Sequence, residues 1–144
     1  MKGVYVLIIK LSDATNITVG KLGKLYFRKG FYTYVGSALG KAGFKRVTRH
    51  FKTSEGINNK RKWHIDYLLP YSKIICAVLL PTHENLECII ASSIKEFSDE
   101  IYGFGCSDCS CSSHLFFTDT DFRNKIINTC ISLVNESIII HMHV

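Results

Sequence analysis

No segment of the sequence is apolar for long enough to cross a membrane. The longest apolar run, IICAVLL from Ile74 to Leu80, has seven residues, whereas a transmembrane helix needs about 20. The opening MKGVYVLIIKL carries one lysine before an apolar stretch that ends at Lys10, and this stretch is too short for a signal peptide. We therefore expect a cytoplasmic protein without a membrane partner.

The sequence also lacks internal repeats, an interdomain linker and the length for two ordinary domains. Its 144 residues, 47% of them hydrophobic and 21% charged, suit one soluble globular domain. Acidic residues are the scarcer charge, with 12 Asp and Glu against 18 Lys and Arg. Eight of the basic residues lie between positions 41 and 62, beside the single acid Glu55. A basic cluster is typical of polyanion-binding proteins, although a solubility bias alone explains the net charge of +6.

The hydrophobic pattern predicts a small domain built on a sheet. Residues 3–10 and 31–36 are rich in β-branched and aromatic residues, as expected of buried strands, and a Gly-rich hairpin lies between them. A third strand is expected at 73–81, and helices after Gly43 and over 83–97. The tail, 119–144, predicts one helix and a final apolar segment. We infer an α/β (α+β) domain with a central, mainly antiparallel sheet flanked by helices, plus an inserted hairpin.

Both predicted helices carry polar residues that a core does not require. Phe44, Val47 and Phe51 have the spacing of an inward stripe. Arg46 and His50 are four residues apart and share a different face. On the later helix, Glu87 lies beside the inward stripe, where a carboxylate either lines a cleft or reaches solvent over a buried stem.

The order of these residues resembles a nuclease signature. The triads GVY at 3–5 and YVG at 34–36, followed by Arg46 with His50 and later by Glu87, resemble the motifs of the GIY-YIG nuclease superfamily. The stretches GKLG, YVGSA, RHF, WHIDYLL, EC and GCSDCSCSSHLF are similar to an uncharacterised prokaryotic subgroup, which also occurs fused to endonuclease III. The resemblance covers about residues 2–117. It implies a GIY-YIG-like nuclease domain at 1–118 and a C-terminal extension at 119–144 packed on the same domain.

One departure concerns the distance between the triads. Twenty-eight residues separate Tyr5 from Tyr34, which is more than the superfamily usually has, and the Gly-rich hairpin supplies the extra length. An insertion at the rim of a site either opens a different groove for the substrate or covers the site. The hairpin therefore bears on the substrate and on activity itself.

The resemblance implies a metal-dependent endonuclease that hydrolyses phosphodiester bonds in DNA during repair or recombination. DNA is favoured over RNA as the substrate, but the sequence does not decide between them. Glu87 would bind one Mg²⁺ or Mn²⁺ through oxygen, and Arg46 would offer a planar fork to the phosphate. Tyr5 or Tyr34 would take a proton from the attacking water, provided that nearby cations, His50 among them, favour the phenolate. The sequence leaves open which tyrosine is the base.

Further residues are expected to contact nucleic acid from the basic segment. They are Lys41, Lys45, Arg49, Lys60, Arg61, Lys62 and His64. Arg49 is a candidate for a backbone phosphate, with a solvated charge as the alternative. The segment WHIDYLL fits a structural role equally well, with Trp63 packed and His64 hydrogen-bonded.

The six cysteines are expected to be thiols, because no export signal precedes them. Cys76 and Cys88 have the pattern of ordinary buried residues. A C-x₂-C-x-C-x₂-H motif offers a complete donor set for zinc, although its spacing is cramped and a tight loop beside the cleft is the alternative. The members of this set are Cys106, Cys109, Cys111 and His114. Two other functions stay open, a non-catalytic nucleic-acid-binding module and a zinc-binding or redox-sensing protein.

Overall fold

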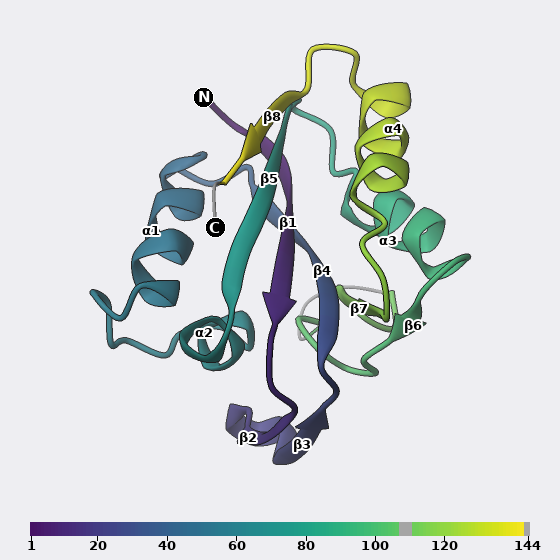
Figure 1. Ribbon diagram of the computed structural model, residues 1–144. Helices are drawn as coiled ribbons and strands as arrows, with labels where there is room; N and C mark the ends of the chain where they lie inside the picture. The colour runs from purple at the N-terminus through teal and green to yellow at the C-terminus, as the bar shows by residue number, and fades with distance from the viewer. Residues whose placement is uncertain (107–110, 143–144) are drawn as a thin grey trace.

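The computed structural model describes residues 1–106 and 111–142 and places a six-stranded sheet between two pairs of helices (Figure 1). Every pairing in the sheet is antiparallel, and the strand order is β6-β7-β4-β1-β5-β8. The strands of this sheet are β1 (Gly3–Leu11), β4 (Gly30–Ala38), β5 (Lys73–Pro81), β6 (Asp99–Glu100), β7 (Leu115–Thr118) and β8 (Ile138–His141). The fold class expected from the sequence is confirmed.

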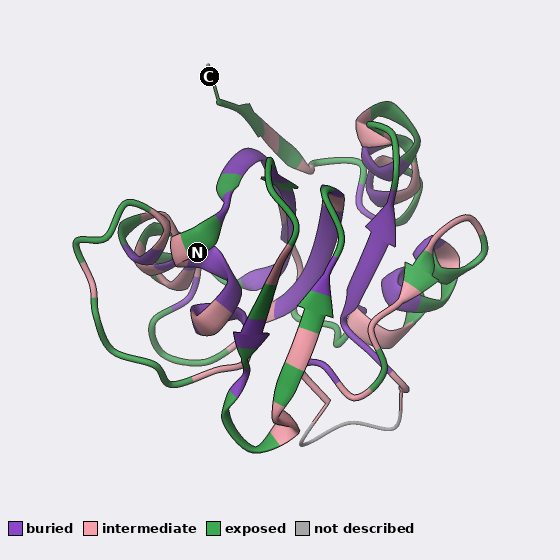
Figure 2. Cartoon of the chain, turned by 60° about the horizontal axis from the view of Figure 1, so that its bottom comes forward, coloured by how far each residue is buried: buried purple, intermediate pink, exposed green. Residues whose placement is uncertain are grey.

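The inner strand β1 is buried on both faces, which explains its nearly continuous apolar sequence. Tyr5, Leu7 and Ile9 face one core, and Val4, Val6 and Ile8 face the other. Figure 2 shows the inner strands of the sheet as buried, while the outer faces of the helices are exposed. Two hydrophobic cores therefore form, one on each side of the sheet.

The helices divide between these two cores. On one face lie α1 (Lys45–Ser54) and α2 (Ile65–Leu68), which continues into the short helix η2 (Leu69–Tyr71). On the other lie α3 (Glu87–Lys95) and α4 (Arg123–Leu133). The predicted helix over 83–97 is thus confirmed, in a shorter form that begins at Glu87. No helix among the described residues is long and apolar enough to span a membrane.

The expected hairpin forms a separate two-stranded sheet at one end of the molecule (Figure 1). Its strands are β2 (Thr15–Thr18) and β3 (Lys24–Phe27), joined through the short helix η1 (Gly20–Leu22). At the other end of the sequence, β8 pairs with β5 and so joins the main sheet. The proposed boundary at residue 118 stays a prediction.

A glycine fixes where α1 starts. Gly43 has a φ of +56°, a conformation that disfavours any residue with a Cβ. The turn allows the backbone N–H of Phe44 to donate to the carbonyl of Met1 at 3.0 Å. The start of α1 is thereby tied to the chain just before β1, which sets the helix over the two triads.

Candidate active site

A cavity of about 360 Å³ lies where α1, α3, β4 and two loops converge. Its charged lining residues are Arg46, Lys62 and Glu87. Tyr34, Trp63, His64 and His114 contribute rings to its wall. Residues that lie far apart in the sequence therefore meet at one pocket, which combines both signs of charge with aromatic surface.

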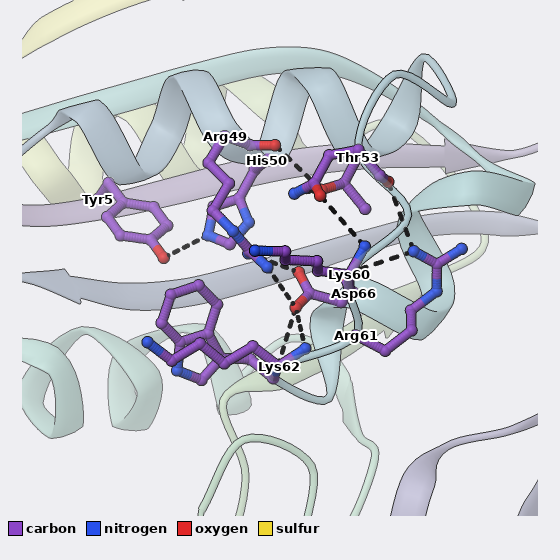
Figure 3. A network of polar contacts seen from close by, with 10 residues as sticks. Tyr5, Arg49, His50, Thr53, Lys60, Arg61, Lys62 and Asp66 are labelled. Atoms are coloured by element: carbon purple, nitrogen blue, oxygen red, sulfur yellow. Dashed lines mark hydrogen bonds and ion pairs between the residues drawn. The ribbon is translucent and has the colours of Figure 1, made fainter.

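Tyr5 and His50 form a buried pair beside this pocket. The Tyr5 hydroxyl oxygen lies 2.6 Å from His50 Nε2 (Figure 3). Burial lowers the pKa of His50 to about 4, so the imidazole is neutral near pH 7. With the ring proton on Nδ1 the phenol donates to Nε2, and with it on Nε2 the imidazole donates to the phenol oxygen. His50 Nδ1 is buried and has no partner among the described residues.

The burial of His50 differs from the face that helical periodicity assigns to it. His50 is fully buried together with Val47 and Thr53, whereas Phe44 and Phe51 are only half-buried. The reason is that α1 packs against both β5 and η2, so its buried face is wider than a single stripe. Sequence periodicity identified Arg46 and His50 as neighbours, but the tertiary packing separates them by depth.

The close approach of Tyr5 explains why the second triad ends in a glycine, Gly36. In the register of β1 with β4, Gly36 lies opposite Tyr5. A Cβ at Gly36 would overlap the ring and hydroxyl of Tyr5. Because Gly36 also lines the pocket, the Tyr5 phenol lies directly beneath the pocket floor.

The two signature tyrosines occupy different depths. Tyr34 lines the pocket and is 8% exposed, whereas Tyr5 is 1% exposed behind it. Their ring centroids are 6.3 Å apart. Burial raises the pKa of both phenols above the usual value, and the Arg46 guanidinium opposes part of this rise. The protein by itself thus keeps both phenols protonated near neutral pH.

Arg46 reaches the pocket from the first turn of α1. Its Nη1 donates to the carbonyl of Ser37 at 2.7 Å, and its guanidinium lies 4.5 Å from the centroid of the Trp63 ring. These two contacts orient the planar group. A guanidinium has five N–H donors, so donors remain for an anion in the pocket.

Arg49, one turn of the helix away, has a different environment (Figure 3). Its two terminal nitrogens donate to the two carboxylate oxygens of Asp66 at 3.0 and 3.2 Å. Asp66 is fully buried and also accepts the backbone N–H groups of Lys62 and Trp63. The guanidinium of Arg49 is therefore engaged by a structural carboxylate, and we no longer assign it to a backbone phosphate. The sequence alone did not indicate this structural role of Asp66.

Three cations surround the Trp63 ring. Arg46 and Arg49 each lie 4.5 Å from its centroid, and Lys62 Nζ lies 4.8 Å from it. Lys62 lines the pocket. The remaining basic residues of the predicted interface, Lys41, Lys45, Lys60 and Arg61, are exposed before, on and after α1. Trp63 thus combines the packing role that the sequence allowed with a place in the pocket wall.

His64 is held in one tautomer by the loop opposite. The backbone N–H of Gly105 donates to His64 Nδ1 at 2.8 Å. Since an accepting Nδ1 carries no proton, the proton of the neutral ring is on Nε2. Burial lowers the pKa of His64, which favours this neutral form. A histidine in the pocket wall with an N–H on Nε2 can donate to an anionic oxygen.

Glu87 is the first residue of α3 and faces the pocket. A carboxylate at a helix N-terminus is favoured by the helix dipole. Its negative charge acts to raise the pKa of both Tyr5 and Tyr34, which places it within electrostatic reach of the two phenols. A half-exposed carboxylate in a pocket suits a hard divalent ion, which typically takes one or two protein carboxylates and keeps several waters. The residues present therefore fit the Mg²⁺ or Mn²⁺ implied by the resemblance.

A second group of metal-ligating side chains includes His114 of the pocket wall. One ligand atom each from Cys88, Cys111 and His114 falls within 4.8 Å of the others, so the three could hold a metal ion. Cys111 Sγ lies 2.8 Å from His114 Nε2. Cys88 is therefore not an ordinary buried cysteine as the sequence suggested, whereas Cys76 is one. Of the loop motif, Cys109 lies outside the described residues, and the group found among the described residues does not include Cys106.

Comparison with known proteins places the chain in a family. The model of a family described as domain of unknown function DUF123 matches residues 4–136. A search of curated proteins and a search of solved structures each found no match. The family match includes the pocket, the Tyr5–His50 pair and the cysteine group. Because the match covers most of the sequence, the chain belongs to the DUF123 family.

Proposed function

We propose that the protein is a cytoplasmic endonuclease that uses one Mg²⁺ or Mn²⁺ ion to hydrolyse phosphodiester bonds in DNA, in repair or recombination. The main support is the convergence of Tyr34, Arg46 and Glu87 on one pocket, next to the Tyr5–His50 pair. These are the residues through which the sequence resembles the GIY-YIG nucleases. Phosphodiester hydrolysis needs a charge sink for the phosphoryl oxygens and activation of water, and the pocket offers groups for both.

Glu87 would hold the ion. When bound, a divalent ion supplies a Lewis acid for a phosphate oxygen and lowers the pKa of coordinated water. Glu87 would contribute the protein oxygen from the start of α3, where it lines the pocket. The neutral His64 would donate its Nε2 proton to a phosphate oxygen from the facing wall.

Arg46 would bind the scissile phosphate. Its guanidinium is oriented by Ser37 and Trp63 and faces the same pocket as Glu87. Lys62, beside the same indole, adds positive charge at the pocket rim. The exposed lysines and arginine around α1 would bind the flanking DNA backbone through salt-dependent contacts.

Tyr34 would be the phenol that contacts the attacking water; the support is that it lines the pocket while Tyr5 lies beneath the floor. The Arg46 guanidinium already acts to lower its pKa, and a divalent ion on Glu87 would act in the same direction. Tyr5 would act as a positioning residue, since its hydroxyl is held by His50 and its ring contacts that of Tyr34.

The test is cleavage of nicked, branched and single-stranded DNA by the purified chain in Mg²⁺ or Mn²⁺. We expect cleavage to need the ion and to fall at least about 100-fold in Glu87→Gln and in Arg46→Ala. Glu96→Gln is the matched control, because Glu96 is an exposed carboxylate at the far end of α3. It should cleave like the unsubstituted chain.

The alternative of a non-catalytic binding module predicts a different result. Such a protein would bind DNA with strong salt dependence and would show no cleavage that requires a divalent ion. Cleavage that persists in Glu87→Gln and Arg46→Ala would point to a contaminating nuclease and would contradict the proposal.

A further inference from the structure

We propose that Cys88, Cys111 and His114 form a zinc site that is separate from the Glu87 carboxylate. The three side chains come from two parts of the fold. Cys88 is the second residue of α3, and the other two lie in the loop that leads into β7. A zinc ion here would tie the loop to the start of the helix.

The geometry is close to what zinc requires. Zinc binds sulfur at about 2.3 Å and imidazole nitrogen at about 2.0–2.1 Å, so neighbouring ligand atoms in a tetrahedral site lie about 3.5–3.8 Å apart. The three ligand atoms in this protein all lie within 4.8 Å of one another. Shifts of about an ångström in the side chains would therefore complete three corners of a tetrahedron.

The chemistry of the donors selects the metal. Two thiolates and an imidazole suit zinc, whereas Mg²⁺ and Mn²⁺ prefer oxygen ligands. The backbone carbonyl of His114 accepts the N–H of Val35 at 2.9 Å, which fixes the backbone that carries this ligand against β4. A solvent molecule or a further side chain completes the coordination. The soft site and the hard site at Glu87 thus differ in the ion that they accept.

The site adjoins the pocket, so an ion bound there would influence the shape of the pocket. Cys88 follows Glu87 directly in the sequence, and His114 itself lines the pocket. The same loop carries Gly105, whose N–H holds His64. An ion on these three ligands would fix the spacing between the α3 side and the loop side of the pocket, and we assign it this structural role.

The first measurement is the metal content of the full chain purified under reducing conditions. We expect about one zinc per chain. Replacement of zinc by Co²⁺ should give the visible absorption of a tetrahedral site and a thiolate-to-cobalt charge-transfer band. Cys88→Ser should bind zinc more than roughly 10-fold more weakly and lose part of the charge-transfer band. Cys106→Ser, a matched change in the same loop outside the group of three, should keep both.

The loop motif that the sequence suggested makes the opposite prediction. It requires Cys106 and not Cys88, so retention of zinc in Cys88→Ser with loss in Cys106→Ser would overturn our assignment. Two other results would overturn it as well. One is that the reduced protein binds no zinc, and the other is that Cys88 and Cys111 form a disulfide that persists in the presence of the reducing agent.

A second measurement is independent of the variants. Chelation of zinc from the unsubstituted chain should lower its Tm, and zinc should restore it, because an ion that binds only the native state stabilises that state. An unchanged Tm in chain that had contained zinc would contradict the structural role. None of these readouts uses DNA cleavage, so this proposal and the nuclease proposal fail separately.

Discussion

The Tyr5 hydroxyl and the His50 imidazole contact each other at 2.6 Å although 45 residues separate them in the sequence. One comes from the innermost part of the sheet and the other from the buried face of α1. The contact lies directly beneath Gly36 on the pocket floor. It therefore links the first triad, the second triad and the helix that carries Arg46.

Replacement of Tyr5 by phenylalanine tests this link. Tyr5→Phe keeps the ring but leaves His50 Nε2 buried without a partner, so we expect a loss of about 1–2 kcal/mol in the free energy of unfolding. Cleavage should also fall, by about 10-fold or more, because the floor of the pocket loses its fixed hydroxyl. Urea unfolding and single-turnover cleavage measure the two effects. A variant of unchanged stability would contradict the importance of the contact.

Tyr34→Phe, unlike Tyr5→Phe, should lower cleavage while leaving stability almost unchanged. The Tyr34 hydroxyl makes no hydrogen bond with the described residues and its side chain lines the pocket. We expect the free energy of unfolding to change by less than about 0.5 kcal/mol, while cleavage falls about 100-fold or more. Cleavage by Tyr34→Phe at the rate of the unsubstituted chain would remove Tyr34 from the mechanism.

The two arginines of α1 should respond differently to substitution by alanine. Arg49→Ala leaves the buried carboxylate of Asp66 without its ion pair, which we expect to cost about 3 kcal/mol of stability. Arg46→Ala loses contacts with Ser37 and Trp63, and we expect a cost nearer 1 kcal/mol with a much larger loss of cleavage. Thermal unfolding and cleavage assays on both variants distinguish them. Equal losses of stability in the two variants would contradict a larger stabilising contribution from the Arg49–Asp66 ion pair.

Gly36→Ala should disturb the pocket without any change of charge. The new Cβ would overlap the Tyr5 phenol, so the ring must shift or the two strands must separate. Overpacking of this kind costs about 1–3 kcal/mol. Gly40→Ala is a suitable control, because a Cβ at Gly40 meets no atom within 4 Å. Similar melting temperatures for the two variants would contradict the close approach of Tyr5 to Gly36.

His50 should make stability depend on pH. Its pKa is about 4 in the native state, where burial disfavours the charged form, against 6.5 when unperturbed. Between these values the unfolded state binds more protons than the native state, so the free energy of unfolding falls as the pH falls. The loss should approach about 3 kcal/mol at pH 4. The measurement that isolates His50 is the difference in the free energy of unfolding between the unsubstituted chain and His50→Gln across this range. If the free energies of unfolding of the two proteins changed with pH in parallel, a neutral buried His50 would be contradicted.

Much of the fold follows from the sequence. The β-branched and aromatic residues of 3–10 and 31–36 predicted two inner strands, and the structure has them as β1 and β4. Glycines and turn formers between them predicted the hairpin, which forms β2 and β3. These features depend on residue type and on local backbone preference, so they can be predicted without any long-range contact.

The sequence predicted only part of the candidate site. Helical spacing placed Arg46 and His50 near each other, but it did not indicate how deeply either side chain is buried. His50 is buried because α1 packs against both β5 and η2. Arg49 and Asp66 are 17 residues apart and belong to different helices, so no periodicity pairs them. In the same way, Cys88 lies on α3 and joins Cys111 and His114 only because that helix packs beside the loop.

The sequence by itself determined the inner strands β1, β4 and β5, the hairpin, the helices α1, α3 and α4, and the residue types available for chemistry, because these depend on neighbours along the chain. Only the tertiary structure decided which side chains share a pocket, which arginine is engaged by a buried carboxylate and which cysteine completes a metal-ligating group. The physical reason is that helix rotation and strand register are set by packing between distant segments, and a change of either moves a side chain from the core to the surface.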